Sequence, residues 1–264
     1  MRLGSMTSDL LCFDSPLDNM LDEMRDVVRW YELSRPRSLQ TSIGPSDAGT
    51  PCARRLAYKM LDVEKVNTAT DPWAAIIGTS VHAWLDKAFS DANAMLAEPR
   101  WEVSTKIDIP GYMTGTIDLF DHATGTVIDH KVIGATAMAK VKKGITSEQY
   151  RTQGHLYGLG LIAAGFDVKH IAICYWSRTG ALRDAHYWTE PYNEAIAEAA
   201  LQRIDALKII TANGVVALAE IPTADGFCLY CPYFSPANTD IAQACPGHVI
   251  PKVSAQPAPD AITK

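Results

Sequence analysis

The hydrophobic period of the chain changes near its middle, and this change limits the folds that the chain can adopt. Apolar and polar residues alternate over 101–109, which predicts a half-buried strand. Two further strands are predicted at 114–120 and 126–132, and the short link 122–125 between them indicates a β-hairpin. The flanking segments follow the helical period instead. We therefore predict an α/β fold of the α+β type, with a mixed sheet in the middle of the chain.

Apolar residues at helical spacing predict helices on both sides of these strands. The predicted helices cover about 16–35, 52–61, 73–96, 146–164 and 194–210, and additional strands are expected at 171–176 and 182–188. Gly and Pro residues predict a loop over 43–51. This order divides the chain into a helical extension over 1–41, a core domain over 42–248 and a loose tail over 249–264.

The composition excludes several classes of protein. The 264 residues include 47% hydrophobic ones, which is enough for a packed core. No apolar run reaches the length of a membrane span, and the polar start does not resemble a secretory signal, so we expect a cytoplasmic protein. The net charge of −6 argues against a broad DNA-coating surface. Seven acids against three Arg within 1–34 explain most of this charge.

The predicted hairpin carries the most informative side chains. Asp129 and Lys131 are two apart in one strand and therefore share a face, and Asp118 in the preceding strand is expected across the ladder from them. Two neighbouring carboxylates repel each other unless a cation such as Mg²⁺ lies between them. A lysine beside such a metal can stabilise charge on a phosphate, so this set suits phosphodiester hydrolysis. Solvated surface charges are the simpler interpretation.

Four more polar side chains occur in two pairs at helical spacing. His82 could add an imidazole ligand, although such a residue is more often structural, and Asp86 one turn later could orient it or merely face solvent. Gln153 and Tyr157 share a helix face and suit gripping a phosphate or orienting a lysine. An ordinary polar helix edge is the alternative.

Four cysteines and one histidine form a second pattern. Cys228 and Cys231 are a C-x₂-C pair, followed by Cys245 and His248. These four could form a Cys₃His zinc site. Alternatively, Cys52 could join the three late cysteines around an iron-sulfur cluster. Reduced cysteines without metal are the third possibility.

Together, these motifs resemble the RecB-like branch of the PD-(D/E)XK nucleases, and more narrowly the iron-sulfur exonucleases found beside CRISPR adaptation genes and in phage genomes. The resemblance covers about 52–245. It rests on the segments Cys52-Ala-Arg-Arg-Leu-Ala-Tyr58, Gly78-Thr-Ser-Val-His82, Gly115-Thr-Ile-Asp118, Ile128-Asp-His-Lys131 and Gln153-Gly-His-Leu-Tyr157, with the closing cysteines.

The resemblance implies a restriction-endonuclease-like core with N-terminal helices and a C-terminal segment that carries a metal cluster. It further implies that Mg²⁺ or Mn²⁺ is bound by His82, Asp118 and Asp129, with the main-chain carbonyl of His130 as a further ligand. Lys131 would position the attacking water, and Gln153 and Tyr157 would support the site. A 4Fe-4S cluster would be held by Cys52, Cys228, Cys231 and Cys245. The long gap between Cys231 and Cys245 departs from the family pattern and keeps zinc, through His248, as the alternative.

The function implied by the resemblance is a DNA exonuclease that acts on single strands or duplex ends, in recombination, repair or CRISPR-adaptation-like processing. Its partners would be DNA and, in such pathways, recombination or CRISPR-adaptation proteins. A rival interpretation is a non-catalytic nucleic-acid- or protein-binding module with a structural Cys₃His zinc site. Five basic residues are candidates for DNA backbone contacts, namely Arg54, Arg55, Lys142, Lys143 and Arg151.

Overall fold

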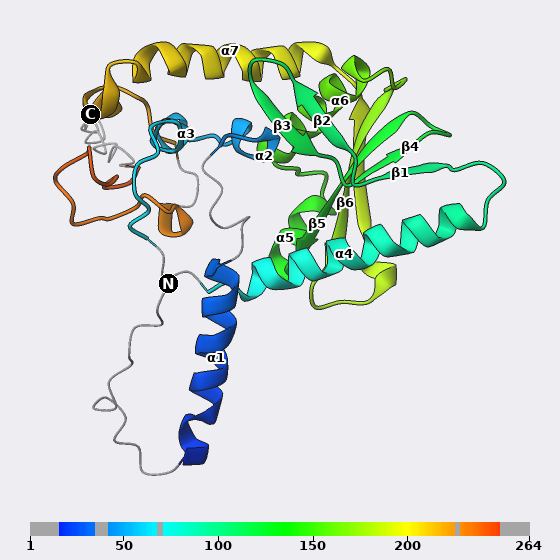
Figure 1. Ribbon diagram of the computed structural model, residues 1–264, viewed down its shortest axis with the longest axis horizontal. Coiled ribbons are helices and arrows are strands. Elements are labelled where there is room, and N and C mark those ends of the chain that lie inside the picture. Colours follow the sequence, from blue (N-terminus) through cyan, green and yellow to red (C-terminus); the bar gives the residue numbers. More distant parts are fainter. Residues whose placement is uncertain (1–15, 35–41, 68–70, 225–227, 249–264) are drawn as a thin grey trace, which may run out of the picture.

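The fold is built on a mixed five-stranded sheet, as predicted for the middle of the chain (Figure 1). The computed structural model describes residues 16–34, 42–67, 71–224 and 228–248. The strand order is β1-β4-β5-β6-β7, and only the central pair, β5 and β6, is parallel. The strands of this sheet are β1 (Trp101–Val103), β4 (Leu119–Asp121), β5 (Thr126–Ile133), β6 (His170–Ser177) and β7 (His186–Pro191).

Two of the predicted strands are each divided in two, and this is the main correction to the sequence analysis. The segment 101–109 forms β1 and then β2 (Lys106–Ile109), and the segment 114–120 forms β3 (Met113–Thr116) and then β4. β2 and β3 pair with each other in a separate two-stranded sheet. Ser104 has a φ of 49°, which turns the chain out of the first sheet. Asp118 consequently lies at the crossing between the two sheets rather than inside a ladder.

Helices cover both faces of the five-stranded sheet. α4 (Trp73–Ala94) contacts β1 and β5 on one face, whereas α5 (Ala135–Val141) and α6 (Glu148–Ala163) lie on the other. α7 (Glu194–Thr211) packs on α6 and extends towards α3 (Ala53–Met60), as Figure 1 shows. The predicted loop 43–51 contains a short helix, α2 (Pro45–Ala48), and α5 was not predicted. The predicted strand 182–188 begins with a 3₁₀ turn at Leu182–Asp184.

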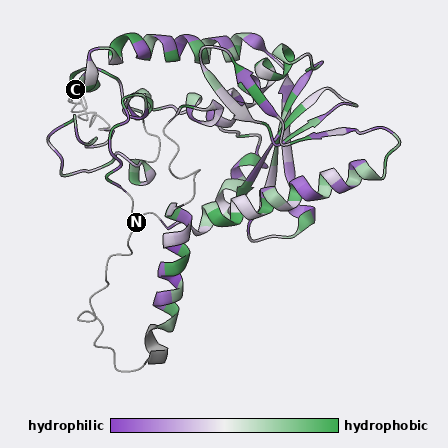
Figure 2. Ribbon diagram, in the orientation of Figure 1, coloured by the Kyte–Doolittle hydropathy of each residue, from purple (hydrophilic) through white to green (hydrophobic). Residues whose placement is uncertain are grey.

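The N-terminal helix α1 (Pro16–Ser34) agrees with the prediction for this segment. Its hydrophobic and hydrophilic residues are interleaved along the helix (Figure 2), and nearly all of its described side chains are exposed. The predicted tail over 249–264 lies outside the described residues. Among the described helices, none is long and apolar enough to cross a membrane.

The last described segment is held to the N-terminal part of the core by two tyrosines. Tyr58 of α3 is fully buried, and its hydroxyl donates a hydrogen bond of 2.5 Å to the carbonyl of Ile241. The ring of Tyr58 also stacks on that of Tyr233, with centroids 5.0 Å apart. The end of α3 and the segment 233–241 are therefore neighbours in space.

The close approach of α2 to α6 generates a stability prediction. A β-carbon at Gly49 would lie 2.5 Å from the main-chain oxygen of Gln149, whereas one at Gly78 in α4 would meet nothing within 4 Å. We expect Gly49→Ala to lower the free energy of unfolding by about 1–3 kcal/mol through overpacking. Gly78→Ala is the matched control and should raise it by about 0.5–1 kcal/mol because alanine is the better helix former. Urea denaturation of both variants measures the difference, and equal stabilities would contradict the described packing.

Candidate active site

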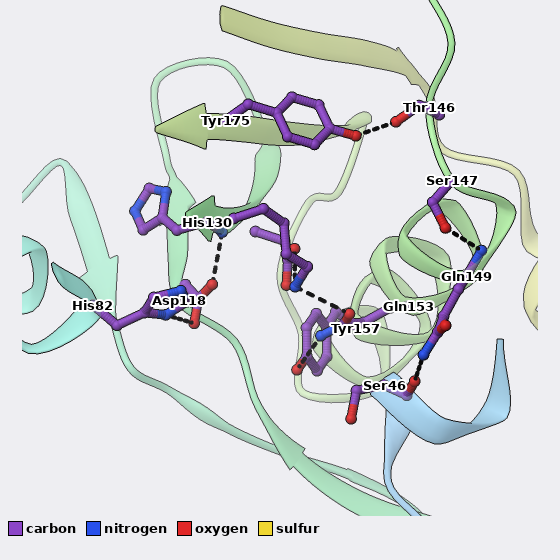
Figure 3. A network of polar contacts seen from close by, with 12 residues as sticks. Ser46, His82, Asp118, His130, Thr146, Ser147, Gln149, Gln153, Tyr157 and Tyr175 are labelled. Carbon is purple, nitrogen blue, oxygen red and sulfur yellow. Dashed lines mark hydrogen bonds and ion pairs between the residues drawn. The ribbon is translucent and has the colours of Figure 1, made fainter. Parts of the chain in front are cut away.

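The carboxylates and the lysine of the predicted hairpin line one hollow. Asp129 and Lys131 project from β5 towards α6, on the same face of the sheet as Ile173 and Tyr175 of β6. Asp118 reaches the same hollow from the crossing between the two sheets. The hollow has a volume of about 940 Å³. In Figure 3, His82 and Asp118 lie on one side of it, and Gln153 and Tyr157 lie on the other.

Asp118 is held by two hydrogen-bonding groups. Its Oδ1 lies 3.2 Å from Nδ1 of His82, and its Oδ2 accepts a hydrogen bond of 2.7 Å from the main-chain N–H of His130. Burial alone would raise the pKa of Asp118, but the hydrogen bonds from His82 and His130 and the charge of Lys131 together lower it. The hydrogen bond with Asp118 in turn raises the pKa of His82, against the effect of burial.

Asp129 is a buried carboxylate that forms an ion pair with Lys131. Its side chain is 2% exposed, and its Oδ2 lies 2.5 Å from Nζ of Lys131. This oxygen accepts no aligned hydrogen bond from any described residue. Burial raises the pKa of Asp129 to about 6, and the negative charge of Asp118 adds to this effect while Lys131 opposes it.

The residues of α6 position Lys131 from the opposite side. Oε1 of Gln153 accepts a hydrogen bond of 3.3 Å from Nζ of Lys131, and Nε2 of Gln153 donates one of 2.9 Å to the hydroxyl of Tyr157. The ammonium group of Lys131 also lies 4.8 Å from the ring centroid of Tyr150. Gln153 is buried, so its amide is held in one orientation. The predicted helix face of Gln153 and Tyr157 therefore faces the lysine.

His130 and Asp86 take positions that the sequence did not reveal. The ring of His130 faces α4, where it meets Phe89 and accepts a hydrogen bond from Trp176, and burial lowers its pKa to about 4. Asp86 lines the hollow and accepts a hydrogen bond of 2.6 Å from Ser104. Lys106 of β2 also lines the hollow and was missed, because an exposed lysine in an alternating strand has no distinguishing signal.

The donor chemistry of the hollow fits a hard divalent cation. Asp118 and Asp129 supply carboxylate oxygens, and His82 supplies an imidazole beside them. Oδ2 of Asp129 is buried and accepts no aligned hydrogen bond within the described residues. A bound cation would compensate its negative charge. As the described side chains stand, no three His, Cys, Asp or Glu residues form a set that holds a metal ion. Instead, the ring of His82 contacts Asp118, and the ammonium of Lys131 contacts Oδ2 of Asp129.

The five basic candidates for DNA contacts are not gathered in one place. Arg54 donates to the carbonyls of Ile221 and Ala219, and Arg151 forms an ion pair of 2.6 Å with Glu190. Both therefore serve contacts within the fold. Lys142 and Lys143 are exposed after α5, outside the lining of the hollow. Arg55 lies beside a different pocket, near α2.

The predicted cysteine pattern converges on one cavity. Cys52 precedes α3, Cys228 and Cys231 lie in and after the 3₁₀ helix η4 (Cys228–Tyr230), and Cys245 follows. All four line the same cavity together with His248, and none of them forms a disulfide. The main-chain N–H groups of Gly247 and His248 lie 3.4 Å from the sulfur atoms of Cys245 and Cys228, respectively. Nδ1 of His248 contacts the hydroxyl of Thr223 at 3.0 Å.

Comparisons with known proteins identify only distant similarities. No protein-family model matches the sequence, and no curated protein matches it. The fold is similar to that of a crystallised protein designated SSO0001, with 18% identity, 81% of this chain and 94% of that chain covered, and a TM-score of 0.48. It is also similar to an alkaline exonuclease from Laribacter hongkongensis, with 13% identity, 69% and 90% coverage and a TM-score of 0.45.

A phage-related exonuclease from Haemophilus somnus is similar at 13% identity, with 61% of this chain and 82% of that chain covered and a TM-score of 0.41.

The pair of His82 and Asp118 generates a prediction for the metal-free protein. Asp118→Asn removes the carboxylate that raises the pKa of His82, while burial and the charge of Lys131, which lower it, remain. We expect the pKa of His82 to fall in this variant, as followed by the ring protons in an NMR titration. Asp86→Asn is the control, because Asp86 is bound to Ser104 and should leave the titration of His82 nearly unchanged. An unaltered pKa in Asp118→Asn would show that the two side chains do not interact.

Proposed function

We propose that this chain is a metal-dependent deoxyribonuclease that hydrolyses phosphodiester bonds at the hollow between β5 and α6. The observation that carries the proposal is the convergence of Asp118, Asp129 and Lys131 on this hollow, with Gln153 and Tyr157 facing them. Two carboxylates and a lysine with fixed neighbours are suited to phosphate chemistry, because their positions are set before the substrate binds.

The side chains have separate roles in this proposal. Mg²⁺ or Mn²⁺ bound by Asp118, Asp129 and His82 would supply the charge that neutralises the phosphate and lowers the pKa of an attacking water. Lys131 stabilises negative charge that develops on the phosphate oxygens, and it is oriented by its contacts with Asp129 and Gln153. Tyr157 holds Gln153 in place through its hydroxyl. His130 holds Asp118 through its main-chain N–H.

The sequence resemblance supports a more specific activity. It favours an exonuclease that acts on single-stranded DNA or on duplex ends, in recombination, repair or CRISPR-adaptation-like processing. An exonuclease requires a free end, so linear DNA should be degraded and a closed circle of the same sequence should resist.

We further propose a structural 4Fe-4S cluster held by Cys52, Cys228, Cys231 and Cys245. Their shared cavity and the N–H groups next to two of the sulfur atoms support this proposal. Such a cluster would join α3 to the last described segment and would contribute to stability rather than to hydrolysis. His248 at the same cavity favours a Cys₃His zinc site as the alternative.

Cleavage assays with labelled DNA test the proposed active site. We expect Lys131→Ala and Asp118→Ala to reduce cleavage by at least about 100-fold, because each removes charge stabilisation of the transition state. Lys87→Ala is the matched control, since Lys87 is exposed on α4, forms an ion pair with Asp91 and does not line the hollow. The substrates are linear and circular DNA, single- and double-stranded, with and without Mn²⁺. Full activity in either active-site variant, with the fold intact by circular dichroism, would refute the assignment. DNA that is bound but never cleaved would favour the binding module.

Optical spectroscopy tests the cluster. Protein purified without oxygen should be brown with broad visible absorption, and Cys228→Ser should lose this absorption and some thermal stability. Cys174→Ser is the control, because Cys174 lies in β6 and does not line the cysteine cavity. A colourless preparation with one zinc per chain would reject the cluster in favour of the zinc site.

A further inference from the structure

A second polar pocket lies next to the proposed active site, and the proposed function assigns it no role. Its volume is about 330 Å³. The pocket is formed by α2, α3, the start of α6 and the segment after η4. Its polar lining includes Ser46, Asp47, Thr50, Arg55, Lys59 and Lys65. We call it the α2–α3 pocket.

The α2–α3 pocket carries an excess of positive charge. Three cationic side chains line it, and Asp47 is the one carboxylate among its lining residues. Oδ2 of Asp47 lies 2.7 Å from Nζ of Lys59 and also accepts a hydrogen bond of 3.0 Å from the main-chain N–H of Gly44. Asp47 therefore neutralises Lys59. The guanidinium of Arg55, which is half-buried, has no carboxylate partner within the described residues. Lys65, which has an interaction of its own, also lines the pocket.

The position of the pocket connects it to the catalytic hollow. Ser46 of α2 lines both spaces, and Gly44 and Pro45 line the hollow on the other side of the same short helix. Nε2 of Gln149 donates a hydrogen bond of 2.7 Å to the carbonyl of Ser46, as drawn in Figure 3. α2 is thereby held between the two spaces. Ser46 therefore lies where the two spaces meet.

We propose that the α2–α3 pocket binds a backbone phosphate of the same DNA strand whose scissile bond lies at Asp118, Asp129 and Lys131. The proposal rests on the proposed nuclease function. The pocket would bind a phosphate next to the scissile one, which the carboxylate-rich hollow does not attract by itself. Arg55 supplies a planar donor pair that matches phosphate oxygens, and Lys65 supplies a second positive charge. The hydroxyl groups of Ser46 and Thr50 are additional donors at the pocket wall.

Binding of DNA without cleavage tests this subsite. The probe is a fluorescein-labelled single-stranded dT oligonucleotide, followed by fluorescence anisotropy in the absence of divalent metal. We expect Arg55→Gln to raise the Kd by about 5- to 10-fold and Lys65→Gln to raise it less, because each removes a charge-assisted contact. The slope of log Kd against log salt should fall by about 0.7 for each lost phosphate contact. Arg183→Gln is the matched control, because Arg183 is exposed in a 3₁₀ turn far along the chain from this pocket.

The controls separate the outcomes. Arg55 also lines the cysteine cavity, so thermal melting and the visible spectrum of Arg55→Gln must match those of the wild type. If they do not, Lys65→Gln decides, since Lys65 is exposed and outside that cavity. Unchanged Kd and salt slope in Lys65→Gln and in a folded Arg55→Gln would overturn the subsite. Binding that depends on these residues in a chain that cleaves no DNA would retain the subsite and reject the nuclease. Competition by inorganic phosphate alone, without any effect of the variants on DNA, would also overturn the subsite.

Discussion

The close packing of α6 against the sheet is the interaction on which the rest of the structure depends. α6 approaches its neighbours through glycines, since a β-carbon at Gly154 would lie 3.0 Å from Ile171 and one at Gly160 would lie 2.7 Å from Ile107. Well-packed interiors do not accommodate such added atoms without displacement. At this distance, Gln153 reaches Lys131 across the interface. The N-terminal end of the same helix holds α2 through Gln149. One helix thus sets the walls of both the catalytic hollow and the α2–α3 pocket.

The electrostatics of the hollow are unfavourable for the protein alone. Asp129 is buried and forms an ion pair with Lys131, and Asp118 depends on His82 and the N–H of His130. Burial of a carboxylate costs free energy unless it is paired, which is why the pKa of Asp129 is raised to about 6. Strain of this kind is typical of sites that bind a cation or react, although ion-pair networks can also produce it. The proposed metal ion would relieve it, and a positively charged neighbouring pocket would help to hold an anionic strand at a negative centre.

The cysteine cavity brings together two segments that lie far apart in the sequence. Cys52 and Cys245 are separated by most of the chain, yet both line the same cavity beside the stacked rings of Tyr58 and Tyr233. Closing a long loop through metal ligands restricts the unfolded chain more than closing a short one. Arg55 lies in the first turn of α3, shortly after Cys52, and lines both the cysteine cavity and the α2–α3 pocket. The proposed cluster and the proposed phosphate subsite would therefore share one structural support, α3.

The sequence by itself determined the types of most elements and which side chains share a strand or helix face. Period-two alternation, helical spacing and Pro or Gly positions predicted the central sheet, a hairpin at the place where β4 and β5 form one, and the long helices, because these signals are local. Asp129 and Lys131 could be placed on one face because strand geometry alone requires it. Tertiary structure decided what local signals do not contain. The positive φ of Ser104 separates β1 from β2. Because β2 and β3 pair in a sheet of their own, Asp118 lies at the crossing of two sheets. The tertiary structure also determines the partners of the arginines, because these depend on which distant segments pack beside each side chain. Arg54 and Arg151 form contacts within the fold, whereas Arg55 lines a pocket.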